Sequence, residues 1–93
     1  MSDASPRLVY IEWIDSAAMH GWRSLQNIRD DATLAVIQSI GWLIVDTDEL
    51  KTVVAHMHMD VPQNGTTRFA SDPFTIPTVV IRKIVDLTIP DEL

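Results

Sequence analysis

Two histidines in the stretch VVAHMHMD, residues 53–60, are the first side chains whose type and spacing could do chemistry. His56 and His58 are two residues apart, so on a β-strand both imidazoles point to the same side. Asp60 continues that side, and His20 is the only other histidine in the chain. A catalytic zinc site needs at least three protein ligands, so we predict no metal site here. We expect a solvent face, a ligand-facing edge or a pH-sensitive interface, since histidine titrates near neutrality.

The tetrapeptide HGWR is the second candidate, and it supplies His20, Trp22 and Arg23. These side chains can stack on a flat ligand and hydrogen-bond to it, and an arginine can clamp a phosphate. The alternative is structural: Trp22 packs a short helix onto the body of the protein, while Trp13 and Trp42 anchor the core or an interface. Trp22 is the best of the three for function, because it lies in an irregular segment with polar neighbours.

Arg68 and Phe69 form the third candidate. They lie in a stretch rich in Pro, Asn, Gly, Ser and Thr, residues 60–73, which predicts a long loop with a tight turn at Asn64-Gly65. Long loops in compact domains are often functional, so this pair could form a lid over a ligand. The alternative is a loop with Phe69 tucked down. The predicted ligand-binding residues are His20, Trp22, Arg23, His56, His58, Arg68 and Phe69.

No catalytic or cofactor-binding motif is present in the sequence. A Walker loop, a dinucleotide fingerprint, a nucleophile elbow and a zinc-protease motif are all absent. The chain has no cysteine, which excludes a thiolate nucleophile and a disulfide framework. The acidic groups Asp30-Asp31 and Asp46-Asp48-Glu49 lack the spacing of a calcium loop. We therefore expect a protein that is not an enzyme and uses no cofactor and no metal.

The formal net charge of −6 limits the partners. Neutralisation of phosphates by Lys and Arg supplies much of nucleic-acid affinity, and here the basic residues are scattered apart from Arg82-Lys83. Nucleic-acid binding is therefore not expected, although one or two arginines could hold a small anion. No apolar run is as long as a membrane span, and the N-terminus lacks a signal-peptide pattern. We expect a cytoplasmic protein with no membrane partner.

Short β-strands must position these candidates. The segment 8–15 is β-branched and aromatic, and Val9, Ile11 and Trp13 share one face by the period of two. The segment 22–29 changes to helical spacing, so a short helix is expected there. Acidic residues at its C-terminal end oppose the helix dipole, so this helix should be marginal unless it is packed.

A bent hairpin follows in the chain. The segment 33–46 is apolar on both faces, which indicates a central strand with a bulge or bend at Gly41. A turn at 46–49 and a returning strand at 50–59 complete the hairpin. Alternation along the returning strand predicts a core face of Val53, Ala55, Met57 and Met59, opposite a face of Thr52, Val54, His56, His58 and Asp60.

Two strands follow the long loop. The segment 74–77 is a short strand that ends at Pro77, and 81–89 is the last strand and a candidate sheet edge. One face of the last strand is expected to carry Ile81, Val85, Leu87 and Ile89. Residues 1–6 are expected to be a frayed terminus. Five short strands in one domain of 93 residues, one of them bent, favour a small twisted barrel.

The stretch from Val36 to Leu87 resembles the small-barrel class of Sm-like and SH3-like proteins. The resemblance rests on the glycine-bent strand VIQSIGWLIVD, the hairpin after it, and the ending DPFTIPTVVIRKIVDL. It implies an all-β fold, a small five-stranded Sm/SH3-like barrel with one short helix after the first strand, as a single domain over residues 1–93. It also implies a homo-oligomer, because such barrels often pair their edge strands. The arginine-glycine pair with which Sm proteins hold RNA is absent from IPTVVIRK.

The whole chain also resembles a group of small uncharacterised proteins of phages and prophages, through EWIDS, HGW, SIGWLI, TIP and IRKI. This resemblance implies no established activity. Together with the small size, the lack of catalytic motifs and the HGWR cluster, it leads us to expect a non-enzymatic binding protein of phage type in the cytoplasm of a bacterial host. We expect it to capture a small ligand, and a nucleotide-derived signal of host defence is the candidate, which would make it an anti-defence sponge. Two alternatives stay open: a protein–protein adaptor or inhibitor of a host protein, and an Sm-like RNA binder.

Overall fold

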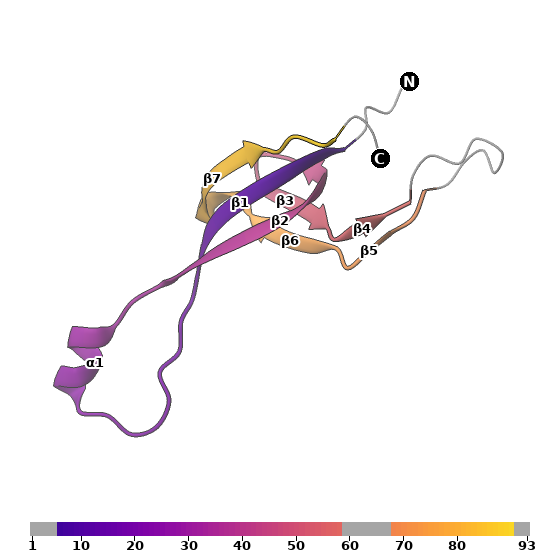
Figure 1. Cartoon of the computed structure of the whole chain (residues 1–93). Helices are drawn as coiled ribbons and strands as arrows, with labels where there is room; N and C mark the ends of the chain where they lie inside the picture. Colours follow the sequence, from indigo (N-terminus) through magenta and orange to yellow (C-terminus); the bar gives the residue numbers. More distant parts are fainter. Residues whose placement is uncertain (1–5, 59–67, 91–93) are drawn as a thin grey trace.

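The computed structural model describes residues 6–58 and 68–90, and β-strands dominate it (Figure 1). The elements in chain order are β1 (Arg7–Asp15), α1 (Leu25–Asp31), β2 (Ala35–Asp46), β3 (Leu50–Val54), β4 (His56–Met57), β5 (Ala70–Ser71), β6 (Phe74–Pro77), the 3-10 turn η1 (Thr78–Val80) and β7 (Ile81–Asp86). The expectation of a mostly β protein is confirmed. The predicted frayed terminus apart from Pro6, the tight turn at Asn64-Gly65, and Met59 and Asp60 lie outside the described residues.

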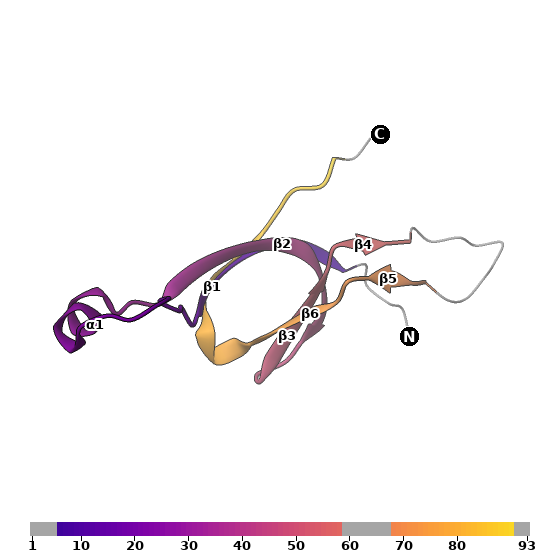
Figure 2. The ribbon, with the colours of Figure 1, turned by 90° about the horizontal axis from the view of Figure 1, so that it is seen from below.

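Five strands form one antiparallel sheet in the order β6-β3-β2-β1-β7. The predicted central strand is β2, at the middle of the sheet, and the predicted edge strand is β7, at one end of it. Figure 2 shows that the sheet curves strongly, with β2 drawn as a long arc. The two edge strands, β6 and β7, are joined directly by η1. β4 and β5 form a separate two-stranded sheet, called the ribbon below.

The core lies on one face of the curved sheet. Its buried residues come from four strands and are Val9, Ile11, Trp13, Leu43, Val53 and Ile76. The indole Nε1 of Trp13 donates to the Ser39 hydroxyl at 3.1 Å, and the Trp13 ring lies 5.6 Å from the Phe74 ring. Burial of Val9, Ile11 and Trp13 confirms the face predicted for the first strand. The core is small for a chain of this length.

A bulge or a bend was predicted at Gly41, and the bulge is wrong. The pairing of β2 with β1 continues without a shift through Gly41, which lies opposite Val9. The irregularity lies further along, where the pairing of β2 with β3 shifts between Leu43 and Val45. A Cβ atom at Gly41 would lie 2.9 Å from the carbonyl oxygen of Val54. Glycine is therefore required for the close approach of β3 to β2.

The prediction of a single returning strand over residues 50–59 is wrong. β3 pairs with β2 only as far as Val54, opposite Trp42, and the chain then leaves the main sheet so that β4 pairs with β5. β2 is strongly curved (Figure 2), so the residues after Val54 have no straight strand beside them with which to continue the pairing. The strict alternation is lost at this break: Val53 and Val54 are both buried, and Ala55 is exposed.

The face predicted for the last strand is also wrong in part. Ile81 lies opposite Trp13 on the core face, whereas Val85 lies opposite Tyr10 on the outer face. The pairing of β1 with β7 shifts between Glu12 and Trp13, so one extra residue on β7 reverses the alternation. Directly opposed residues share a face of the sheet, so Ile81 and Val85 cannot lie together.

Replacement of Gly41 by alanine should lower the free energy of unfolding by about 1–3 kcal/mol, because the new methyl group must push β3 away from β2. Urea unfolding followed by circular dichroism measures this. The matched control is Gln38→Ala on the exposed side of the same strand, which removes one exposed hydrogen bond to the Tyr10 hydroxyl and should cost about 0.5 kcal/mol. Equal stability of Gly41→Ala and the unmodified protein would contradict the account of this contact.

Candidate functional site

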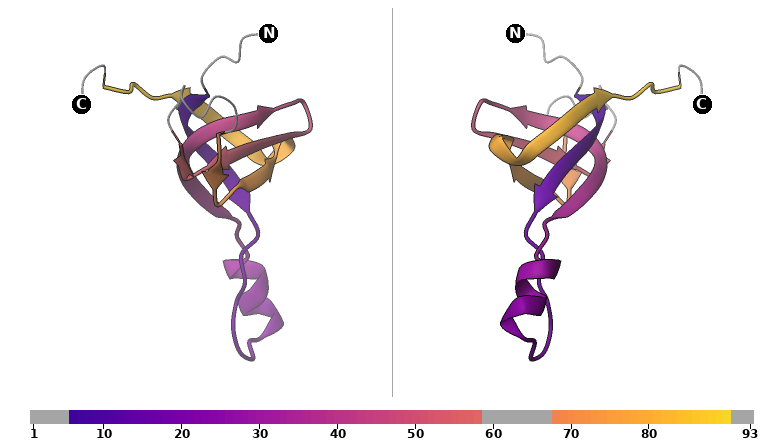
Figure 3. Two further views of the ribbon diagram at one scale, coloured as in Figure 1. Left: turned by 90° about the vertical axis from the view of Figure 1, so that its right-hand side faces the viewer. Right: turned by 90° about the vertical axis from the view of Figure 1, so that its left-hand side faces the viewer.

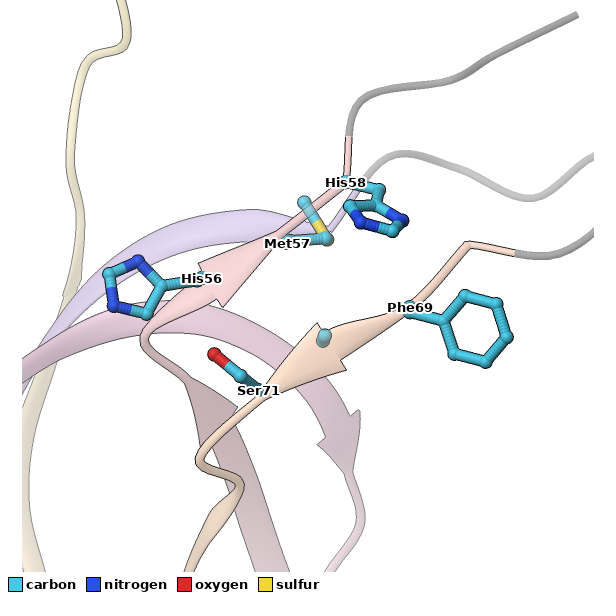
Figure 4. A pocket seen from close by; sticks show the side chains of 6 residues that line it. His56, Met57, His58, Phe69 and Ser71 are labelled. Carbon is cyan, nitrogen blue, oxygen red and sulfur yellow. The ribbon is translucent and has the colours of Figure 1, made fainter.

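The ribbon brings together His56, His58 and Phe69, three of the predicted ligand-binding residues. His56 lies opposite Ser71, and the backbone N–H of His58 donates to the carbonyl oxygen of Phe69 at 2.9 Å. Directly opposed residues point to the same side of a two-stranded sheet. His56, His58, Phe69 and Ser71 therefore belong to one side of the ribbon, and Figure 4 shows them around its two strands.

The two rings at the outer end of the ribbon contact each other. The centroids of the His58 and Phe69 rings are 6.0 Å apart, with an angle of 81° between the ring planes. This edge-to-face arrangement is favourable because the positive edge of one ring meets the negative face of the other. The pair thus holds an imidazole and a phenyl ring in a fixed mutual orientation on the surface.

Arg68 was expected to face a ligand, and the structure shows a bracing contact for it. Its Nε and Nη2 atoms donate to the carbonyl oxygen of His58 at 3.0 Å and 2.8 Å. The guanidinium therefore reaches from the β5 segment to the β4 segment. It holds these two segments of the chain together beside His58. A charged donor makes a stronger hydrogen bond than a neutral one, so this contact also fixes the backbone beside the His58 ring.

A shallow hollow of about 230 Å³ lies on the ribbon. Its lining consists of His56, Met57, His58, Phe69, Ala70 and Ser71 (Figure 4). All of these except the half-buried Met57 are exposed. The imidazoles and the hydroxyl can hydrogen-bond to a ligand, and Phe69 offers a ring face for stacking. Within residues 6–58 and 68–90, no three His, Cys, Asp or Glu side chains are grouped closely enough to hold a metal ion.

The other three predicted residues, His20, Trp22 and Arg23, lie far from the ribbon. They belong to the segment between β1 and β2, residues 16–34, called the arm below. Figures 1 and 3 show the arm projecting from the sheet, and Figure 1 shows it at the end opposite to the ribbon. The molecule measures 63 × 29 × 22 Å along its principal axes. Within one copy, the predicted residues thus form two separate groups.

The helix of the arm begins at Leu25, later than predicted, because Ser24 caps it. The Ser24 hydroxyl accepts from the backbone N–H of Asn27 at 3.0 Å, which satisfies one of the free donors of the first turn. The acidic C-terminal end is compensated locally: Gln26 donates to Asp30 at 2.8 Å, and Asn27 donates to Asp31 at 2.9 Å. No residue of α1 is buried.

The alternative prediction, that Trp22 packs the short helix onto the body of the protein, is wrong. Its side chain is 103% exposed, so it does not pack the helix onto the sheet. The reason is the position of the arm, which carries Trp22 away from the core that Trp13 occupies. Arg23 is engaged within the arm, since its Nη1 donates to the side-chain oxygen of Asn27 at 2.6 Å and lies 3.8 Å from Asp31.

Three residues of the ribbon hollow were not predicted as functional: Ala70, which offers only a methyl group, and Ser71 and Met57. Met57 was assigned to the core by the alternation of the returning strand, which fails at the break after Val54. Ser71 gives no signal in the sequence, because its pairing with His56 crosses a long connection. Met57 and Ser71 could not be predicted because the sequence does not show that β4 separates from β3 and pairs with β5.

The comparisons with known proteins add no relative. No family model matches the chain, and no curated protein or solved structure matches it significantly. The resemblances to Sm-like barrels and to small phage proteins therefore stay predictions. No helix in the described part of the chain is long and apolar enough to cross a membrane.

Replacement of Arg68 by alanine should increase the hydrogen-exchange rate of the His58 backbone amide about fivefold. Loss of the two hydrogen bonds should lower the free energy of local opening of the ribbon by about 1 kcal/mol. Residue-resolved exchange by NMR measures this. The control is Lys83→Ala on the edge strand β7 of the main sheet, which should leave the His58 rate unchanged. If Arg68→Ala leaves it unchanged too, the guanidinium does not brace the ribbon.

Proposed function

We propose that this chain is a non-enzymatic binding protein that captures a small flat ligand on the ribbon. The observation that carries the proposal is the hollow of about 230 Å³ that His56, His58 and Phe69 help to line. Ligand sites typically combine apolar and aromatic lining with a few polar groups that set orientation. This hollow combines them on a structure that stands apart from the core.

The chemistry of the hollow favours a heteroaromatic ring as ligand. Phe69 can stack on the face of such a ring, and each neutral imidazole offers one hydrogen-bond donor and one acceptor. Ser71 adds a hydroxyl that both donates and accepts. A nucleobase presents both properties, a stackable face and an edge of donors and acceptors. A nucleotide-derived signal is therefore the ligand class that we propose, with bacterial host defence as the setting that the phage resemblance suggests.

We further propose that the curved sheet is a small five-stranded barrel of the Sm/SH3-like kind. The strand order supports this, since β6 and β7 are the two edges and only the three residues of η1 separate them in the chain. Closure of a sheet removes edges that otherwise invite aggregation. Such a barrel would provide a rigid base from which the ribbon projects.

Native mass spectrometry after incubation with a bacterial nucleotide extract should show a small molecule retained by the protein. Phe69→Ala should lower its affinity by at least about fivefold, because loss of a base-stacking ring costs about 1–3 kcal/mol. Titration calorimetry with the identified molecule quantifies the loss. Val79→Ala is the matched control, since Val79 is also an exposed apolar residue but lies in η1.

Two results would contradict this proposal. One is a mass spectrum without a retained molecule under mild conditions. The other is a ligand that binds equally well to the unmodified protein, to Phe69→Ala and to His58→Ala, because its site then lies outside the ribbon.

A protein–protein adaptor or inhibitor is the second candidate function. The observation that favours it is the exposed apolar side of the arm, where Trp22 and Leu25 are 103% and 68% exposed. Exposed tryptophans frequently anchor protein interfaces. Under this alternative the purified protein would retain one host protein in a defined ratio and not a small molecule, and Trp22→Ser would release it.

A further inference from the structure

The arm carries an apolar surface that no other part of residues 6–58 and 68–90 covers. Leu25 and Ile28 are three residues apart in α1 and therefore share one side of the helix, and Trp22 precedes the helix. All three are exposed in the structure. A helix of seven residues gains too few hydrogen bonds to be stable alone in water, and α1 has no buried residue to compensate. The arm therefore requires a covering surface.

An apolar hollow in the main sheet offers such a surface. It measures about 240 Å³ and is lined by Ser39, Ile40, Val53, Val54, Ala55, Asp72 and Phe74. Ile40 and Phe74 are 65% and 47% exposed, although both belong to strands of the main sheet. Phe74 lies opposite Val53 on the core face, whereas Ile40 lies opposite Tyr10 on the outer face, so the hollow opens at the margin of the sheet where β3 leaves β2. Exposed apolar side chains around a concave surface are typical of interaction sites. We call this surface the sheet hollow.

The dimensions of the chain indicate that a second copy covers both surfaces. A compact monomer of 10.5 kDa exposes about 5,400 Å², whereas this chain exposes 7543 Å². Its radius of gyration is 18.3 Å, against about 12 Å for a compact chain of this length. The excess is about 2,000 Å² for each chain, or about 4,000 Å² for two chains. Obligate dimers bury about 2,000–5,000 Å² summed over both chains, so this excess lies in their range.

Charge complementarity supports the same pairing of surfaces. Arg29 follows Ile28 on the arm helix, and Asp72 is the only charged residue that lines the sheet hollow. Within the described residues, neither Arg29 nor Asp72 forms an ion pair. Of the two cations on the arm, Arg23 pairs with Asp31 within the arm, and Arg29 is the one that matches the anion of the sheet hollow. Both surfaces are on every chain, so a two-fold axis forms two identical contacts at once.

We propose that two copies of this chain exchange arms. In this dimer, Trp22, Leu25 and Ile28 of one copy pack into the sheet hollow of the other around Ile40 and Phe74, and Arg29 faces Asp72. The inference goes beyond ligand capture, because it uses neither His58 nor Phe69. Failure of the dimer and failure of ligand capture are therefore separate results.

Disulfide trapping tests where the arm docks, because the chain contains no cysteine of its own. Leu25→Cys and Ile40→Cys chains, one with an affinity tag that changes its mass, are co-expressed, purified and mildly oxidised. The expected product is the mixed disulfide between residue 25 of one chain type and residue 40 of the other. A product that contains only 25–25 or only 40–40 disulfides, or no cross-linked product, would overturn the proposal.

Trp22→Ser tests whether the arm holds the dimer together. Trp22 packs against nothing in its own chain, so the variant should keep the far-ultraviolet circular dichroism of the sheet while its mass in light scattering falls from two chains to one. Val79→Ser is the matched control: Val79 is 90% exposed but lies outside the arm and the sheet hollow, so this variant should stay dimeric. A monomeric unmodified protein, a dimeric Trp22→Ser variant, or equal dissociation of both variants would contradict arm exchange.

Discussion

The close contact between β2 and β3 at Gly41 is the constraint on which the rest of the structure depends. A Cβ atom there would meet the Val54 carbonyl oxygen at 2.9 Å and the Val53 side chain at 3.1 Å. Most domains bury an apolar sheet face against a second layer of helices or strands. In the described part of this chain no second layer covers the sheet, so its own curvature must bring Val53 and Ile76 against Val9 and Ile11.

This construction explains why the candidate residues stand outside the body of the protein. The curved sheet uses β2 over its full length, but β3 follows it only to Val54, and the chain beyond becomes the ribbon. The connection from β1 to β2 likewise projects as the arm (Figure 3). The ribbon and the arm therefore project from the main sheet and are exposed to other molecules. We propose ligand binding on the ribbon and docking of the arm on the sheet hollow of a second copy.

Much of the main sheet could be predicted from local patterns. The first strand and its buried face follow from the period of two at Val9, Ile11 and Trp13, and the turn after β2 follows from a threonine that bonds its own backbone. The Thr47 hydroxyl accepts from the N–H groups of Glu49 and Leu50 at 3.2 Å and 3.0 Å. These features depend on neighbours in the chain, so one sequence is enough to indicate them.

The errors arise where a strand changes partner or register. His56 and His58 were correctly expected on the exposed side, but alternation could not show that β4 leaves β3 and pairs with β5. The misplaced Ile81 follows from one extra residue opposite Glu12 and Trp13, and such a shift depends on a strand distant in sequence. The exposure of Trp22 was unpredictable for a related reason: helical spacing shows that a segment has an apolar side and not what covers that side.

Amide hydrogen exchange of the arm helix is the most direct test of the claim that the arm becomes ordered on a second copy. The Ile28 N–H, which donates to the Ser24 carbonyl at 3.1 Å, is a suitable reporter, with Ile11 in β1 as the internal reference. The account predicts protection of Ile28 in concentrated protein and its loss on dilution, while Ile11 stays protected. Exchange of Ile28 at the rate of an unstructured peptide at every concentration would contradict it.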